Sequence, residues 1–145
     1  MTQELRNLVH VENIPIRWGD MDALSHVNNT IFFRYMEIAR INWLDKMGVH
    51  IDSTTEVGPI IMTAACTFLK QLTYPGNLTI KMYLGQPGRS SIMTYYDMCK
   101  EGEETLYAEA SAKIVWANYA LGKSCPLPEE MRKLATPTST AALSK

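Results

Sequence analysis

The chain shows little imbalance of charge and no long apolar run. Its 145 residues carry 14 Lys and Arg against 15 Asp and Glu, which leaves a formal net charge of −1. This balance provides neither the basic face of a nucleic-acid-binding protein nor a polybasic membrane segment. No apolar run approaches the roughly 18 residues that span a bilayer, and residues 1–11 lack the apolar core of a signal peptide. We therefore expect no nucleic-acid partner and no membrane association.

Cysteine is also scarce, and its placement excludes further classes. The three cysteines, Cys66, Cys99 and Cys125, lie far apart and form no Cys-x-x-Cys pair. This pattern argues against a disulfide framework and against a zinc site, so we expect no bound metal. Three unpaired thiols are typical of the reducing cytoplasm, where we expect the protein to reside. The sequence also lacks a Gly-x-Ser-x-Gly elbow, a phosphate-binding loop and a dinucleotide fingerprint.

The length and the hydrophobic content of the chain fit one domain. Hydrophobic residues make up 46 % of the chain, which is enough to form a core at this length without disulfide or metal support. We assign residues 1–135 to a single domain. Residues 136–145 are rich in Ser, Thr and Ala without a hydrophobic period, so we expect a mobile tail there.

A change of hydrophobic period predicts one long helix. Between Thr30 and Met47, apolar residues recur every three or four positions, which is typical of a helix face. Asn28 or Asn29 can cap the start of this helix, and Gly48 can end it.

The other predicted elements are strands, over residues 9–18, 60–72, 78–86, 90–100 and 104–118. Short turns between the last four favour antiparallel neighbours, and Pro15 predicts that the first strand lies at a sheet edge or carries a bulge. One helix on one antiparallel sheet is an α+β layout. Because one helix covers such a sheet thinly, we expect a second copy to complete the burial or extend the sheet.

The stretch between the first strand and the helix gathers chemically active side chains. Over residues 17–29 it holds two carboxylates, an imidazole and two amides: Asp20, Asp22, His26, Asn28 and Asn29. The helix N-terminus beside them has unpaired amides and a partial positive charge, so it can stabilise an oxyanion. A nearby carboxylate can attack a carbonyl or activate water. These are the parts that thioester hydrolysis needs.

A second interpretation of these residues stays open at this point. Asp and Asn before a helix are also favoured simply as turn and cap residues. A lone histidine such as His26 is commonly a hydrogen-bonded structural residue. Spacing alone therefore does not distinguish a catalytic loop from a helix cap.

Segment 20–29, with the sequence Asp-Met-Asp-Ala-Leu-Ser-His-Val-Asn-Asn, resembles a known family signature. The signature, Asp-x-Asp-x-x-Gly-His-Val-Asn-Asn, belongs to the 4-hydroxybenzoyl-CoA thioesterase-like family, and the resemblance extends over most of the chain. It implies a hotdog fold, in which a curved five-stranded antiparallel sheet wraps a long central helix. It also implies active sites at a homodimer interface, with a homotetramer expected.

The resemblance implies which carboxylate acts. In one branch of the family the first Asp is the nucleophile or general base, and that role falls on Asp20. In the plant acyl-carrier-protein branch the second Asp, an Asn two residues later and the His are implicated, at Asp22, Leu24 and His26. Leu24 departs from that pattern, so we expect Asp20 to be the catalytic carboxylate. Ser25 stands where the signature has Gly, which alters the turn or places a hydroxyl near the site.

The remaining site residues follow from the same resemblance. We expect catalytic contributions from Asp20, His26 and Asn28, and substrate contacts from Asp22, Asn29, Thr30, Ile31, Arg89 and Ser90. Backbone amides near the helix start would hold the thioester oxygen, while His26 and Asn28 position the loop or polarise the carbonyl. Arg89 could meet a coenzyme A phosphate, although a solvated arginine at a turn is the alternative.

We therefore interpret the chain as an acyl-CoA thioesterase that releases a fatty or aromatic acid. Coenzyme A is part of the substrate, and we expect no other cofactor. Two alternatives remain: a hotdog protein that binds an acyl-CoA or acyl carrier without hydrolysing it, and a hotdog hydratase or dehydratase. Retention of both Asp20 and Asp22 argues against the first. Hydratase members carry Asp-x-x-x-x-His, a spacing that His26 forms with neither carboxylate.

Overall fold

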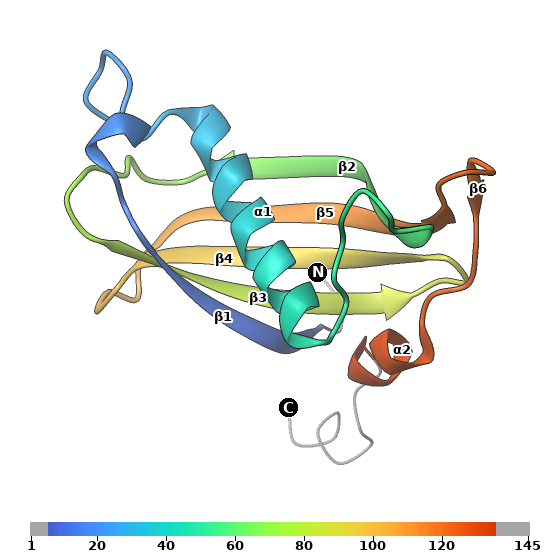
Figure 1. Cartoon of the computed structure of the whole chain (residues 1–145). Helices are drawn as coiled ribbons and strands as arrows, with labels where there is room; N and C mark the ends of the chain where they lie inside the picture. Colours follow the sequence, from blue (N-terminus) through green and yellow to red (C-terminus); the bar gives the residue numbers. More distant parts are fainter. Residues whose placement is uncertain (1–5, 136–145) are drawn as a thin grey trace, which may run out of the picture.

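The computed structural model of the protein describes residues 6–135, and the tail expected over residues 136–145 lies outside them. The elements run in the order β1 (Asn7–Pro15), a 3-10 turn η1 (Trp18–Asp20), α1 (Asn29–Lys46), β2 (Val57–Phe68), β3 (Asn77–Pro87), β4 (Ser91–Lys100), β5 (Leu106–Asn118), β6 (Lys123–Ser124) and α2 (Glu129–Ala135). One sheet forms the body of the molecule, and α1 lies across one of its faces (Figure 1).

The sheet is antiparallel throughout, with the strand order β1-β3-β4-β5-β2 and β6 beside β5. β3, β4 and β5 pair in sequence order, which agrees with the short turns between them. The expected pairing of β2 with β3 is wrong, because β2 pairs with β5 and β3 pairs with β1 instead. β1 and β2 form the two edges, which confirms the prediction that the strand containing Pro15 is an edge strand.

Alternation along the strands decides which sheet face is buried. The inward positions of the three inner strands are almost completely buried: Leu78, Ile80, Met82 and Leu84 in β3, Ile92, Thr94, Tyr96 and Met98 in β4, and Ala108, Ala110, Ala112, Ile114 and Trp116 in β5. These side chains and one face of α1 form a single core.

The helix α1 begins where Asn28 caps it. The side-chain Oδ1 of Asn28 accepts a hydrogen bond from Thr30 N–H at 2.9 Å. Beyond the other end, Gly48 adopts a φ of 85°, which glycine tolerates without strain. The helix therefore starts and ends one residue earlier than predicted. The residues that it buries are Phe32, Tyr35, Met36, Ala39, Arg40, Trp43 and Leu44.

The strand predicted over residues 60–72 ends early, at Phe68, because its regular pairing with β5 breaks off there. The N–H groups of Leu69 and Lys70 both donate to the carbonyl of Tyr107, at 2.9 and 3.1 Å. Two amides that share one carbonyl cannot continue a regular ladder, so the chain leaves the sheet there. Residues 69–72 then form a separate segment beside the start of α1.

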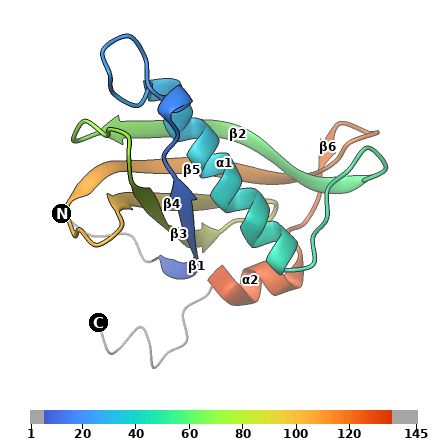
Figure 2. The same ribbon diagram turned by 60° about the vertical axis from the view of Figure 1, so that its left-hand side comes forward.

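The elements β6 and α2 were not predicted from the sequence. With 7 residues, α2 is too short for its hydrophobic period to stand out. It lies below the C-terminal end of α1, near the start of β1 (Figure 2), and Asn7 Nδ2 donates to Leu134 O at 3.1 Å. Within residues 6–135, no helix combines the length and the apolar character that crossing a bilayer needs.

Replacing Met131 by alanine should lower the free energy of unfolding by about 2–5 kcal/mol, because its fully buried side chain would leave a cavity in the core. Leu134 on the same helix is 42 % exposed, so Leu134→Ala should cost about 1 kcal/mol or less. Urea unfolding of the two variants measures the difference. Equal losses would show that α2 does not close the core.

Candidate active site

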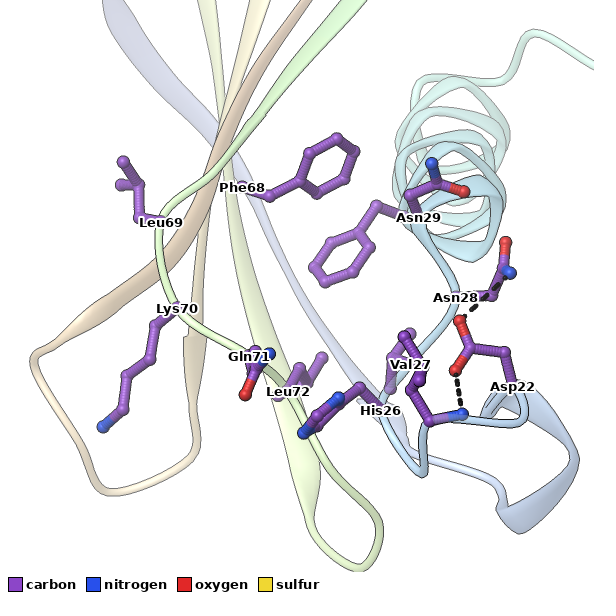
Figure 3. Close-up of a pocket in the computed structure, with 12 residues that line it drawn as sticks. Asp22, His26, Val27, Asn28, Asn29, Phe68, Leu69, Lys70, Gln71 and Leu72 are labelled. Carbon is purple, nitrogen blue, oxygen red and sulfur yellow. Dashed lines mark hydrogen bonds between the residues drawn. The ribbon is translucent and has the colours of Figure 1, made fainter.

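A cleft of about 480 Å³ lies between the start of α1 and the segment that follows β2 (Figure 3). One wall consists of Asp22, Leu24, His26, Val27, Asn28, Asn29 and Phe32, and the other of Phe68, Leu69, Lys70, Gln71 and Leu72. The two walls are joined by a backbone hydrogen bond from Val27 N–H to Leu72 O at 2.8 Å. This bond fixes the loop before α1 relative to the segment after β2.

Asp22 presents its carboxylate from a tight turn. The turn is closed by Ser25 N–H, which donates to Asp22 O at 3.0 Å. Asp22 Oδ1 accepts from Leu24 N–H at 2.9 Å, and Oδ2 accepts from Asn28 Nδ2 at 3.3 Å. Each oxygen has a single donor and a carboxylate can accept about four hydrogen bonds, so both oxygens keep capacity for a substrate or a water molecule.

The first turn of α1 leaves one amide open. Thr30 N–H donates to Asn28 Oδ1, and Ile31 N–H donates to Asn28 O, both at 2.9 Å. Asn29 N–H has no acceptor in residues 6–135, and Asn29 lines the cleft. An unpaired amide at a helix N-terminus attracts negative charge. Of the three residues predicted to hold an oxyanion, Asn29 alone offers a free N–H.

The floor of the cleft is apolar. The rings of Phe32 and Phe68 meet edge to face, with centroids 5.2 Å apart and planes at 75°. Val27 and Leu72 are buried beside them. A ligand in this cleft therefore meets carbon on one side and a carboxylate, an imidazole and amides on the other.

Asp20 is held outside the cleft. Its Oδ2 accepts from Tyr35 OH at 2.7 Å and from Arg17 N–H at 3.1 Å, and Asp20 is not among the residues that line the cleft. Burial, the hydrogen bond to Asp20 and the charge of Asp20 raise the pKa of Tyr35 above its ordinary value, while the charge of Arg17 opposes the rise. Asp20 thus ties η1 to a buried side chain of α1.

Among the other predicted site residues, His26 lines the cleft, and its ring has no hydrogen-bond partner within residues 6–135. Arg89 and Ser90 lie in the turn between β3 and β4, at the opposite end of β4 from the cleft. Ser90 O accepts from Trp116 N–H at 2.7 Å. Within one chain, the structure does not bring Arg89 and Ser90 to the site.

Sequence analysis did not identify Tyr35 or segment 68–72 as part of the site. Tyr35 belongs to the apolar stripe of α1, and the only sign of a further role is a hydroxyl on a buried face. Segment 68–72 reaches the cleft through the pairing of β2 with β5, where Phe68 faces Ala108. No local sequence pattern encodes such a long-range contact.

The chemistry available at the cleft is that of a carboxylate, an imidazole and amides. Burial raises the pKa of the nearby Cys66 thiol to about 11, so this thiol is protonated at neutral pH and is a poor nucleophile. Residues 6–135 contain no group of three or more His, Cys, Asp or Glu side chains that could hold a metal ion. Among the residues that line the cleft, Asp22 supplies the carboxylate and His26 the imidazole.

Comparisons with known proteins agree with this chemistry. Residues 16–134 match the thioesterase-like superfamily. The structure is similar to that of the PA2801 protein of Pseudomonas aeruginosa, a candidate thioesterase, with a TM-score of 0.84 and 34 % identity, over 87 % of this chain and 97 % of that one. A candidate acyl-CoA thioesterase from Xanthomonas campestris gives a TM-score of 0.68 and 26 % identity, over 75 % of this chain and 92 % of that one.

One further relative, the uncharacterized protein YsmA of Bacillus subtilis, is 24 % identical over 83 residues. The match covers 57 % of this chain and 56 % of YsmA, so the chain spans just over half the length of that relative.

The fold and the comparisons define a thioesterase-like class of protein. The chain belongs to the thioesterase-like superfamily, whose match covers residues 16–134. The sequence-based identification of a hotdog thioesterase family is confirmed, and so is the prediction of an antiparallel sheet with a helix.

Ser25 adopts a φ of 63°, in the left-handed region that a side chain disfavours by roughly 1–2 kcal/mol. Ser25→Gly should raise the free energy of unfolding by about 0.5–1 kcal/mol, because this relief exceeds the entropy that glycine adds to the unfolded chain. Ser25→Ala keeps the Cβ and should give no gain. Thermal unfolding of both variants tests this, and equal stability would show that the turn carries no strain.

Proposed function

We propose that the protein hydrolyses an acyl-CoA to a free acid and coenzyme A at this cleft. The supporting observation is that one cleft combines the Asp22 carboxylate, the free Asn29 amide and an apolar floor. A thioester needs these three things: a nucleophile or base, a donor for the developing oxyanion, and a dry surface for the acyl group. The similar protein from Xanthomonas campestris is named as an acyl-CoA thioesterase, which supports the same substrate class.

The contacts favour Asp22 as the reactive carboxylate. Asp22 lines the cleft and keeps capacity on both oxygens, whereas Asp20 is outside the cleft and engaged by Tyr35. The sequence-based assignment of this role to Asp20 stays a prediction. In our proposal Asp22 reacts and Asp20 holds the loop in place.

The reaction then needs no group beyond the cleft and water. Asp22 attacks the thioester carbon, or takes a proton from a water molecule that attacks it. The charge that develops on the carbonyl oxygen is met by Asn29 N–H, and His26 in the same wall can donate a second hydrogen bond. The C–S bond breaks, and coenzyme A leaves as the thiolate. In the direct route, water then hydrolyses the mixed anhydride, which releases the acid and restores the carboxylate.

The acyl group would rest on the rings of Phe32 and Phe68. Such a floor accepts aliphatic and aromatic acyl groups alike, so we propose a fatty or aromatic acyl-CoA as the substrate. The cytoplasmic location expected from the cysteines stays a prediction.

Thiol release from a panel of short, medium, long and aromatic acyl-CoAs tests the function. Wild type should turn over at least one of them, and Asp22→Asn should lower kcat by about 10²–10⁴-fold, because the reactive oxygen is lost. Asp20→Asn keeps an oxygen acceptor for Tyr35, so its loss should be smaller.

Two outcomes would contradict this scheme. If Asp20→Asn abolished turnover and Asp22→Asn did not, the catalytic carboxylate would be Asp20. If wild type bound acyl-CoAs without releasing thiol from any of them, the protein would be a binding protein, or would act on an acyl-carrier-protein thioester.

We also propose that two copies of the chain join along β2. This edge strand carries exposed apolar side chains, at 38–60 % exposure: Val57, Ile60, Ile61, Met62 and Phe68. A long apolar edge with unpaired backbone groups is a ready site for pairing with another chain. Phe68 lies both on β2 and in the cleft wall, so the partner would stand next to the site. The tetramer expected from the family resemblance stays a prediction.

Met62→Lys should weaken this dimer, because Met62 is 60 % exposed on β2 and a buried lysine without a partner is costly. Val11→Lys is the matched control, since Val11 is 45 % exposed on the opposite edge strand β1. Light scattering after size exclusion gives the mass of each variant. A monomeric wild type, or equal effects of the two lysines, would contradict pairing along β2.

A further inference from the structure

We propose that Tyr35 is a positioning residue for the site, and that it acts through Asp20 on the loop that carries Asp22. This inference rests on the proposed function, because it assigns the geometry of the reactive carboxylate to a residue outside the cleft. It assigns to Asp20, the first carboxylate of the Asp-x-Asp pair, the role of holding the loop in position. It also gives a task to a tyrosine that the proposed reaction does not otherwise use.

Asp20 is the point where the site loop closes. Its backbone carbonyl accepts from Asn28 N–H at 3.0 Å, and its backbone N–H donates to Arg17 O at 3.0 Å. The loop over residues 21–27 therefore begins after Asp20 and ends before Asn28, and the Asn28–Asp20 hydrogen bond joins its two ends. Asp22 lies within this loop. A displacement of Asp20 would move both ends of the loop, and with them the Asn28 amide that holds the Asp22 carboxylate.

Tyr35 is a buried side chain that holds the Asp20 carboxylate in place. The tyrosine is 2 % exposed, and its hydroxyl donates to Asp20 Oδ2 at 2.7 Å. Its ring meets the ring of Phe32 edge on, with centroids 6.0 Å apart, and Phe32 lines the cleft. One rigid side chain thus contacts both the anchor of the carboxylate loop and the floor on which the acyl group rests. Supporting contacts of this kind set the precision of a site.

The contact is also insensitive to pH around neutrality. Burial and the neighbouring Asp20 charge raise the pKa of Tyr35, so its hydroxyl stays a donor. A phenolate there would oppose the Asp20 carboxylate. The contribution of the neutral Tyr35 hydroxyl to stability is complete below the pKa of an unfolded tyrosine, about 10. This contribution is lost as the pH rises from there toward the higher folded-state pKa. Above that pH, wild type should therefore lose stability more steeply than Tyr35→Phe.

The kinetic test compares Tyr35→Phe with wild type on the best acyl-CoA of the panel. Loss of the hydroxyl should lower kcat by roughly 10- to 100-fold, since a shift of about 1 Å in a reactive group costs that much. KM should stay within roughly threefold, because Tyr35 does not line the cleft. Tyr119→Phe is the matched control. It removes a hydroxyl that donates to Pro59 O at 2.9 Å, and it should leave kcat unchanged.

A double variant shows whether Tyr35 acts through Asp20. Asp20→Ala with Tyr35→Phe should lose no more activity than Asp20→Ala alone, because the second change removes a contact that no longer exists. Asp20→Asn should retain more activity than Asp20→Ala, since the amide oxygen still accepts from Tyr35. Additive losses, or a Tyr35→Phe variant with wild-type kcat, would overturn the inference.

A measurement that needs no turnover separates this inference from the proposed function. Amide hydrogen exchange should be faster at Asn28 and across residues 21–27 in Tyr35→Phe, and unchanged there in Tyr119→Phe. Unchanged exchange in both variants would overturn the positioning role. Absence of thiol release by wild type, together with faster exchange in Tyr35→Phe, would overturn the thioesterase proposal and leave the link from Tyr35 to the loop intact.

Discussion

The first turn of an α-helix carries amides with no partner inside the helix, and this site depends on how α1 distributes them. Asn28 occupies the amides of Thr30 and Ile31, one with its side chain and one with its backbone carbonyl. The amide of Asn29 is left over at the wall of the cleft. Because the other side-chain group of Asn28 holds the Asp22 carboxylate, one asparagine sets the positions of both the carboxylate that we propose reacts and the amide that we propose meets the oxyanion.

Much of this arrangement could be predicted from the sequence because it is local. The apolar period from Thr30 onward gave the helix to within one residue at each end. The N-cap followed from an asparagine before that period. Pro15 predicted an edge strand or a bulge, since proline has no N–H to donate to a ladder, and β1 is an edge strand. Each of these features depends on residues within a turn or two of one another.

Most of the features that sequence analysis missed depend on distant contacts. Segment 68–72 becomes a cleft wall only because β2 pairs with β5 and Val27 donates to Leu72. Our proposal that Asp20 holds the loop while Asp22 reacts depends on Tyr35 in α1, whose hydroxyl donates to Asp20. Within the loop, the spacing of the two carboxylates is equally compatible with either as the reactive one. The helix α2 is too short to show a period, although it closes the core.

Backbone hydrogen bonds hold both ends of the cleft wall of residues 69–72. The amides of Leu69 and Lys70 donate to one carbonyl, and the carbonyl of Leu72 accepts from Val27. None of these bonds depends on which side chain stands at positions 69–71, while the reacting groups come from the opposite wall. Side chains at positions 69–71 can therefore vary without loss of these bonds, so one wall of the cleft can change its chemistry while the wall that carries Asp22 and Asn29 keeps its geometry.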